Sequence, residues 1–342
     1  MNTLRFKIFI FLIFILLSYP LLYYTYKFYT PDFGGKDFYF YYPLYKNFDI
    51  SKTEAPFNMR LVSTLIVYLL NKTSCYYYTN ITYHHPDIEQ SIFFNAIFLN
   101  WLSVVITAQL IFIYLFNNIN QFLISFILSI IYIFSFGTIL FCINPNTDGF
   151  SILLITITFI LYKKKSNWIY LMYPLLLFQR EFAFIIFGII AFFDILKNKA
   201  NNTFFKIQLI VNILFFILYY TLRKTFFLTP VYANQVTESG FLNNLFYISL
   251  NVNDFIKQAF LTQNILFIYV FLLLINGKKN IQKNKQNLLL LLIFIFVTFI
   301  ISRIAVANNN MGRFIHMFSP ILIIEMLAPE LTQMANHLKN KF

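Results

Sequence analysis

Arginine is the rarer basic residue of this chain, and its placement is the feature that most suggests chemistry. The sequence holds twenty lysines but only six arginines, of which Arg5 alone precedes the first apolar segment. A planar guanidinium binds phosphate or carboxylate through two parallel hydrogen bonds, which a lysine ammonium does not do. The remaining five fall at the ends of apolar segments or between them, on what is predicted to be one side of a membrane: Arg60, Arg180, Arg223, Arg303 and Arg313. This one-sided set predicts an anionic ligand on that side.

Two aspartates lie early in the same predicted outer region. Asp32 and Asp37 flank a Gly-Gly turn and are followed by the aromatic run 38–42. A carboxylate at the membrane surface can act as a general base toward an acceptor hydroxyl or amine. Aromatic faces suit sugar rings or the interfacial region of a lipid. An ordinary polar loop with an aromatic belt is the structural alternative for this segment.

A further acid, Asp148, lies in the sequence Asn-Pro-Asn-Thr-Asp-Gly, directly before an apolar segment. A carboxylate in the first turn of a helix, or at its N-cap, stabilises the helix through the exposed backbone N–H groups. The functional interpretation is a second acid that faces the same cavity as the first-loop aspartates. Both interpretations remain open at the level of sequence.

The tripeptide Gln179-Arg180-Glu181 separates two short apolar segments. An ionisable residue within a membrane span costs about 2.5–3.5 kcal/mol on insertion scales, so such residues pair or line a wet cavity. A local ion pair between Arg180 and Glu181 is the structural alternative, although adjacent helical residues point roughly 100° apart. We favour a functional role for Arg180. Arg303 and Arg313 flank another loop and are either interface anchors or, together with Arg180, phosphate ligands.

A metal site has little support in the sequence. His84 and His85 precede Asp87 and Glu89, but adjacent histidines rarely ligate one ion and the cluster lacks a recognised spacing. Nucleotide-binding motifs of the Walker or GxGxxG type are absent from the sequence. The sequence therefore predicts neither a metal nor a cofactor.

The composition indicates that the apolar segments that carry these residues belong to a membrane protein. Hydrophobic residues make up 59% and charged residues 11%, with 46 Phe and 24 Tyr, whereas soluble domains carry about 25% charged residues. The net charge of +13 comes largely from lysines clustered between apolar runs. That pattern is the positive-inside signal and argues against nucleic acid as a partner. We expect an all-α polytopic membrane protein.

Hydropathy and the lysine clusters predict a single integral membrane domain over 1–342, with about ten membrane segments, several of them short. Thirteen lysines then lie inside, seven outside, and both termini are cytoplasmic. Long outer loops are predicted at 27–90 and 223–257. The apolar stretch 58–70 is too short to cross and is expected to lie at the outer interface. The predicted segments are 8–26, 91–116, 122–143, 150–162, 168–178, 182–196, 207–222, 260–275, 288–302 and 314–327.

Several of these motifs, in this order, resemble the GT-C superfamily of polytopic glycosyltransferases. An N-in first span is followed by a long outer loop with an early aspartate, in Gly-Lys-Asp-Phe-Tyr-Phe-Tyr. Next come Pro-Phe-Asn-Met-Arg before an interfacial helix, Asn-Pro-Asn-Thr-Asp at the second outer loop and Gln-Arg-Glu at the third. Arg313 to Pro320 opens a late span. The likeness covers most of the chain by topology, through short motifs.

The resemblance implies a membrane glycosyltransferase that takes a sugar from a polyprenyl-phosphate donor on the extracytoplasmic face. Asp37, or Asp32 in its place, would be the catalytic base. The donor phosphate would be held by Arg60, Arg180, Arg303 and Arg313, while Asp148 and Glu181 would orient the acceptor or an arginine. Phe38 follows Asp37 where several branches carry a second acid, so metal dependence is not expected.

The same resemblance implies the partners and the location of the protein. These are a lipid-linked sugar donor, a glycan or lipid acceptor, and the bilayer of a bacterial inner (plasma) membrane. Three other functions are kept as alternatives, one of which is a structural or assembly subunit. An O-antigen-type polysaccharide polymerase would also use outer arginines, with lipid-diphosphate substrates. A transporter or lipid flippase should place ionisable residues near the midplane, where Glu325, within the last predicted span, is the nearest acid.

Overall fold

The computed structural model describes residues 4–29, 37–53, 57–73, 88–197, 203–226, 268–273, 285–304 and 311–339. Over these ranges the protein is all-helical, which confirms the predicted structural class. The helices are α1 (Leu4–Phe28), α2 (Asp37–Asn47), α3 (Leu61–Lys72), α4 (Gln90–Ile119), α5 (Phe122–Ile133), α6 (Asp148–Lys163), α7 (Ile169–Leu177), α8 (Phe182–Lys197), α9 (Thr203–Thr225), α15 (Lys285–Ile304), α16 (Met311–His316), α17 (Ser319–Leu322) and α18 (Ala328–Lys339).

Among the described residues, three helices are long and apolar enough to cross a membrane: α1, α4 and α9. They contain 25, 30 and 23 residues. At 1.5 Å per residue, a helix of about 20 residues already spans the 30 Å hydrocarbon core. All three coincide with predicted spans. The shorter helices α6, α7 and α8 also lie where the sequence predicts short apolar segments.

The chain forms two compact units. One comprises Met1–Leu16, Val105–Leu140 and Glu238–Phe342, and the other comprises Leu17–Val104 and Phe141–Thr237. We call these the first and the second unit. The second unit contains α2, α3 and α6 to α9. It therefore holds these charged residues of the first three predicted outer segments: Asp37, Arg60, Asp148, Arg180 and Glu181.

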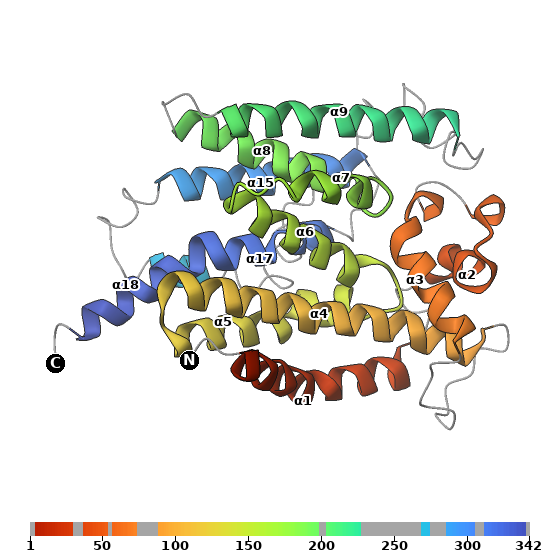
Figure 1. Cartoon of the computed structure of the whole chain (residues 1–342), viewed down its shortest axis with the longest axis horizontal. Coiled ribbons are helices and arrows are strands. Elements are labelled where there is room, and N and C mark those ends of the chain that lie inside the picture. The colour runs from red at the N-terminus through yellow and green to blue at the C-terminus, as the bar shows by residue number, and fades with distance from the viewer. Residues whose placement is uncertain are drawn as a thin grey trace. The chain divides into compact units, whose positions relative to one another are not determined.

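Helices α8 and α9 lie side by side in the second unit (Figure 1). Two contacts fix their antiparallel register. The rings of Phe184 and Phe215 are 5.6 Å apart, and a Cβ built on Gly188 would lie 4.0 Å from that of Asn212. The opposite side of α9 is apolar and exposed, including Ile210, Leu214 and Ile217, as expected for a helix that faces lipid.

A buried polar cluster joins α7 to the inner side of α9. The Tyr173 hydroxyl donates to the Gln208 side-chain oxygen, and Asn212 Nδ2 donates to the Tyr173 hydroxyl at 3.1 Å. Such hydrogen bonds between apolar helices hold them together where no water competes.

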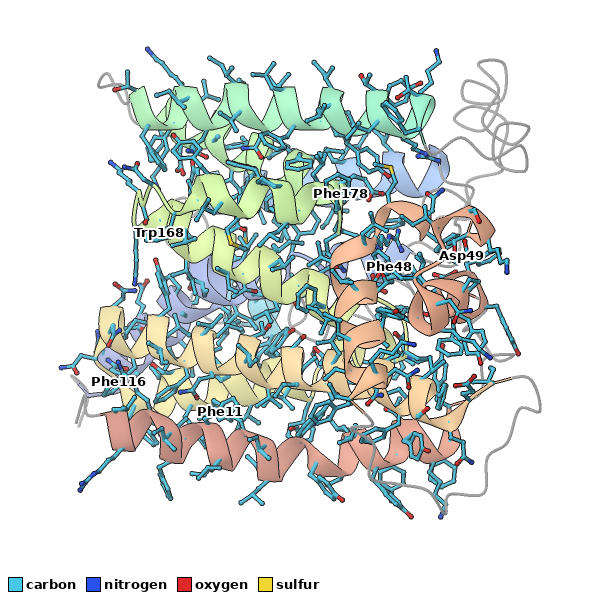
Figure 2. The ribbon with its side chains drawn as sticks, turned by 45° about the vertical axis from the view of Figure 1, so that its right-hand side comes forward. Phe11, Phe48, Asp49, Phe116, Trp168 and Phe178 are labelled. Atoms are coloured by element: carbon cyan, nitrogen blue, oxygen red, sulfur yellow. The ribbon has the colours of Figure 1, made fainter. Side chains whose placement is uncertain are left out.

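The described part of the predicted first outer loop contains two α-helices. The apolar helix expected at 58–70 is α3, and its position at the membrane interface stays a prediction. Helix α2 was not predicted; it packs against α3 and buries Phe38, Tyr41, Leu44 and Tyr45. Figure 2 shows Phe48 and Asp49, just after α2, at the same end of the second unit as Phe178, and Trp168 at the other end.

The prediction of one span at 122–143 is wrong in detail. Helix α5 ends at Ile133, and a π-helix over Thr138–Cys142 follows the interruption. The hydroxyl groups of Ser135 and Thr138 both donate to the Tyr132 carbonyl, at 3.0 and 2.7 Å. Because side chains bond this carbonyl, the regular helical ladder is interrupted here.

The predicted last span, 314–327, is likewise interrupted. Helix α16 ends at His316, α17 covers Ser319–Leu322, and a π-helix over Ile323–Leu327 leads into α18. Pro320 lies in the first turn of α17. Proline has no N–H to bond the carbonyl four residues earlier and is favoured at a helix start, which accounts for the new helix at this point.

Two predicted features lie largely outside the described residues. They are the outer loop 223–257, of which 223–226 are described, and the span 260–275, of which 268–273 are described as helical. Helix α15 covers the predicted span 288–302 and extends it at both ends.

Gly149, the second residue of α6, generates a stability prediction. A Cβ at this position would lie 2.4 Å from the backbone oxygen of Cys142 and 2.9 Å from that of Asn100. Since backbone atoms cannot easily move aside, we expect Gly149→Ala to lower the free energy of unfolding by about 1–3 kcal/mol. Thermal unfolding of the full chain in detergent measures this loss.

Gly188→Ala is the matched control, because its Cβ would meet only an ordinary contact at 4.0 Å. Alanine has the higher helix propensity, so Gly188→Ala should leave stability unchanged or raise it. Equal melting temperatures for the two variants would show that the close approach at Gly149 has no energetic consequence.

Candidate functional site

The segment between the π-helix and α6 is a buried polar turn. Residues 143–149 are buried although most are polar. Asn100 Nδ2 donates to the carbonyls of Asn144 and Asn146, at 3.0 and 2.6 Å, and Asn100 Oδ1 accepts from the Phe150 N–H at 3.1 Å. The Tyr45 hydroxyl lies 3.1 Å from the Asn146 carbonyl. These bonds from α4 and α2 hold the turn that delivers Asp148.

Asp148 forms a buried ion pair with Arg180. Arg180 Nη2 lies 3.1 Å from Asp148 Oδ1, and the two side chains are 2% and 1% exposed. Asp148 is the first residue of α6, and its N-cap, Thr147, makes no side-chain cap hydrogen bond. The first-turn position expected from sequence is therefore correct, but the carboxylate also has a specific cationic partner. The pairing of Arg180 with the distant Asp148 is not evident from the sequence.

Tyr41 connects Arg60 to the turn that carries Asp148. Arg60 is the buried N-cap residue of α3, and its Nη1 donates to the Tyr41 hydroxyl. Its guanidinium carbon lies 5.8 Å from the Tyr41 ring centroid and 5.5 Å from that of Phe57. The Tyr41 hydroxyl also lies 3.2 Å from Thr147 Oγ1. Tyr41 thus joins Arg60 to the residue that precedes Asp148.

Gln179 connects three elements around the two arginines. Its Oε1 accepts from the Ser63 N–H of α3 at 2.9 Å, and its Nε2 donates to the Thr147 carbonyl and to Ser151 Oγ, at 3.2 and 3.0 Å. The Val62 N–H also donates to the Phe178 carbonyl at 3.2 Å. The first turn of α3 is therefore fixed to the corner between α7 and α8 (Figure 2).

This structural role of Gln179 was missed from sequence. The charges of Arg180 and Glu181 between apolar segments predict a functional role, whereas the neutral amide of Gln179 carries no such signal.

Glu181 completes the charged cluster. It lies at the α7–α8 corner and is partly exposed. Burial acts to raise the pKa of its carboxyl, but the guanidiniums of Arg60, Arg180 and Arg223 outweigh that effect, so the pKa lies below the usual 4.5. Three of the five arginines predicted on the outer face thus act on one carboxylate.

The other predicted site residues fall as follows. Asp37 is the first residue of α2 and is partly buried. It precedes Tyr41 by four residues, which places both on one face of the helix. Arg313 is buried in α16, and Arg303 lies in α15; both belong to the first unit. The structure therefore gathers Arg60, Arg180, Asp148 and Glu181 but does not assign Arg303 and Arg313 to this cluster.

Asp32, His84 and His85 lie outside the described residues. Within the described ranges, no three His, Cys, Asp or Glu side chains form a group that could hold a metal ion.

Asp49 provides a contrast to the clustered acids. Its Oδ1 accepts from the Ser51 N–H at 3.1 Å and from Ser51 Oγ at 2.6 Å, as the N-cap of a short 3₁₀-helix. The hydrogen bond from the Ser51 hydroxyl lowers the pKa of this partly exposed carboxyl. Local capping and an ion pair with Lys52, at 3.5 Å, account for Asp49.

No protein-family model, curated protein or solved structure gives a significant match to the chain.

The buried ion pair generates a prediction for the free energy of unfolding. Asp148→Asn leaves the Arg180 charge buried without its carboxylate, so we expect a loss of about 3–5 kcal/mol. Arg180→Gln should destabilise similarly. The double variant should lose less than the sum of the two, because no unpaired charge remains. Chemical unfolding of all four proteins in the same detergent gives this double-mutant cycle.

The exposed pair of Lys46 and Glu89, with side chains 44% and 48% exposed, is the control. Glu89→Gln should change stability little, since surface ion pairs contribute little. Strictly additive losses for Asp148→Asn and Arg180→Gln would contradict the proposed coupling.

The lowered pKa of Glu181 predicts a pH dependence. A carboxyl whose pKa is lower in the folded state stabilises the fold above its unfolded value, and this contribution is lost as the pH falls through the folded value. Below about pH 4.5, the wild type should therefore lose stability more steeply than Glu181→Gln. Melting temperatures of both proteins between pH 3 and 7 test this, and parallel curves would contradict it.

Proposed function

We propose that the chain is a membrane glycosyltransferase that moves a hexosyl or pentosyl group from a polyprenyl-phosphate donor to a glycan or lipid acceptor. The observation that carries the proposal is the cluster of buried arginines and acids built around the Asp148–Arg180 pair. Arg60 and Arg180 come from different elements, yet each is adjacent to the same turn, 143–148. Guanidiniums fixed in this way suit a phosphate that must be bound and then released as a leaving group.

The arrangement within the second unit also supports the proposed side of reaction. The charged cluster lies where α7 meets α8, and α6 ends at Lys163, followed by Lys164 and Lys165. Lysines mark the cytoplasmic side of a membrane protein. We therefore propose a GT-C-like protein with about ten membrane segments, in the bacterial inner membrane. Its termini are cytoplasmic and its active site is extracytoplasmic.

In the proposed step, the Asp37 carboxylate accepts the proton of the acceptor hydroxyl. The acceptor oxygen then attacks the anomeric carbon from the side opposite the phosphate. The bond from that carbon to the phosphate oxygen breaks, the bonding electrons leave with the lipid phosphate, and the sugar configuration inverts. Asp32 is the alternative base. This step uses side chains of the chain alone.

The arginines act on the leaving group in this proposal. Arg60 and Arg180 bind the donor phosphate and stabilise the negative charge that develops on it. Asp148 fixes the orientation of Arg180, and Glu181 lies beside both arginines. Arg303 and Arg313 are proposed as further donor ligands because they lie on the same predicted side of the membrane.

One observation favours a second candidate function, a transporter or lipid flippase. The Tyr173–Gln208–Asn212 cluster places uncharged polar groups near the middle of α9, where a transport path would need them. A polysaccharide polymerase with lipid-diphosphate substrates would use the same arginines.

Turnover with lipid-linked sugars tests the main proposal. Wild type, Asp37→Asn and Arg180→Lys would be incubated in nanodiscs with a panel of polyprenyl-phosphate sugars, and free polyprenyl phosphate would be measured. Asp37→Asn should lower turnover by at least about a hundredfold, the usual contribution of a general base. Arg180→Lys should raise KM for the donor although the charge is kept, because lysine lacks the planar fork.

Glu89→Gln, an exposed acid of the same predicted face, is the matched control and should retain activity. Phosphate release by wild type that persists unchanged in Asp37→Asn would remove Asp37 as the base. No release with any donor, from protein shown to be folded, would favour the polymerase or the transporter. Lipid-diphosphate donors and lipid-movement assays in vesicles then distinguish these two.

A further inference from the structure

The turn between α6 and α7 carries three consecutive lysines and a tryptophan. Helix α6 ends at Lys163, and Lys164 and Lys165 follow it, both exposed. Trp168, the N-cap residue of α7, is 69% exposed. Tryptophan is enriched at the headgroup level of a membrane, where its apolar ring and its N–H group both find suitable surroundings. We call residues 163–168 the lysine turn.

Contacts with the start of α9 place the lysine turn at one end of a helix that is able to cross a membrane. The rings of Tyr162 and Phe205 lie 5.5 Å apart, and Lys165 Nζ lies 5.3 Å from the centroid of the Phe205 ring. Phe205 belongs to the first turn of α9, whose 23 residues are long and apolar enough to span the bilayer. With α9 across the bilayer, as proposed, the lysine turn lies at the level of the lipid headgroups.

Trp168 also begins an exposed apolar face of α7. Leu171 and Leu175, 60% and 39% exposed, follow it by three and seven residues and so lie on the same side of the helix. An exposed apolar face of a membrane helix is expected to contact lipid tails. On α7 this face ends at an indole and then at ammonium groups. The same order, from apolar tail to charged headgroup, is found along a phospholipid.

The charge around the lysine turn is positive. In the sequence from 160 to 206, lysines outnumber acids six to two. One of these acids, Glu181, lies beyond the other end of α7. The other, Asp194, accepts a hydrogen bond from the Tyr162 hydroxyl at 2.9 Å. Within the described ranges, the two exposed lysines of the turn form no ion pair. An anionic headgroup is therefore complementary to this surface.

Lys165 occupies a backbone position that does not favour lysine. Its φ is 51°, in the left-handed region. Its N–H donates to the Tyr162 carbonyl and the Ser166 N–H donates to the Leu161 carbonyl, both at 3.0 Å. This is a Schellman motif, in which the left-handed residue is usually glycine because a Cβ is disfavoured there. Formation of the turn therefore does not account for lysine at this position, whereas a role for its ammonium group would.

We propose that the lysine turn binds the headgroup of an anionic phospholipid. The ammonium groups of Lys164 and Lys165 contact the headgroup phosphate. The Trp168 indole lies beside the glycerol backbone, and the acyl tails lie along the exposed face of α7. In the proposed topology this lipid belongs to the cytoplasmic leaflet. The site is at the end of α7 opposite the proposed catalytic cluster and does not depend on sugar transfer.

Fluorescence of Trp168 in the full chain measures which lipid lies beside it. The chain has two tryptophans, and the other, Trp101, is buried with its Nε1 bonded to Ser18. Subtraction of the Trp168→Phe signal from that of the wild type isolates Trp168. Brominated lipid tails quench an indole that they contact. Two nanodiscs of identical phosphatidylglycerol and phosphatidylcholine content are compared, with the same amount of bromine on the first lipid or on the second.

Brominated phosphatidylglycerol should quench Trp168 as though it were enriched about fivefold or more over brominated phosphatidylcholine, because each lysine near an anionic lipid adds about fivefold in affinity. Sodium chloride should reduce this preference. Replacement of both exposed lysines, Lys164→Gln with Lys165→Gln, should bring it within about twofold of equality. Lys165→Gly should also lower it, yet its melting temperature should not fall, because glycine suits the left-handed position.

Lys224→Gln is the matched control. Lys224 is exposed in the last turn of α9, about 28 Å along the helix from Phe205, and its replacement removes the same charge as Lys165→Gly. It should leave the lipid preference unchanged. Equal quenching by the two brominated lipids, a preference kept in the double variant, or equal losses in Lys165→Gly and Lys224→Gln would overturn the proposal. Loss of the preference on addition of inorganic phosphate, but not of sodium chloride at the same ionic strength, would overturn the assignment to a lipid.

Discussion

A carboxylate and a guanidinium removed from water must compensate each other, and the arrangement of the second unit follows from this requirement. Each ion alone would cost several kcal/mol in a nonpolar interior. Asp148 and Arg180 meet at 3.1 Å with almost no exposure, so the start of α6 and the corner between α7 and α8 must lie together. An arrangement that moved the start of α6 away from the α7–α8 corner would leave a buried charge without its partner. The ion pair therefore restricts how these helices can pack.

Neutral hydrogen bonds extend this restriction outward from the ion pair. Gln179 ties α3 to the turn before Asp148, and Tyr41 ties α2 to the same turn through Thr147. Segments that hydropathy alone would leave as an outer loop are thus fixed against the helices. The guanidinium of Arg60 is held by the Tyr41 hydroxyl, as that of Arg180 is held by the Asp148 carboxylate. Binding groups held in this manner lose little further conformational entropy when a ligand arrives.

The sequence predicted the helices well where apolar length decides the outcome. Helices α4, α6, α8 and α9 lie close to their predicted ranges, because about twenty apolar residues, or a short run ended by lysines, have few other arrangements in a membrane. The interruption after α5 was not predictable, since it depends on two hydroxyl groups that bond the Tyr132 carbonyl. A Ser or Thr in an apolar segment usually bonds its own helix without breaking it.

The site was predictable as a set of charged residues but not as a set of pairs. Asp148 and Arg180 were both singled out for their charge, yet their contact depends on how α6 and α7 pack, which no spacing encodes. Arg223 was predicted only as one of several outer arginines, and its electrostatic effect on Glu181 becomes apparent only in the structure. Asp37 is related to the cluster by its position in α2, one helical turn before Tyr41, which accepts a hydrogen bond from Arg60.

The separation of Asp148 and Arg180 along the chain also has a consequence for biogenesis. The ribosome synthesises the segment with the acid before the segment with its basic partner. Until α7 has followed α6, Asp148 lies at the end of an apolar helix without the guanidinium that later covers it. Arg180 is in turn synthesised after the carboxylate with which it pairs. The order of synthesis thus gives the arginine a partner at the moment of its arrival.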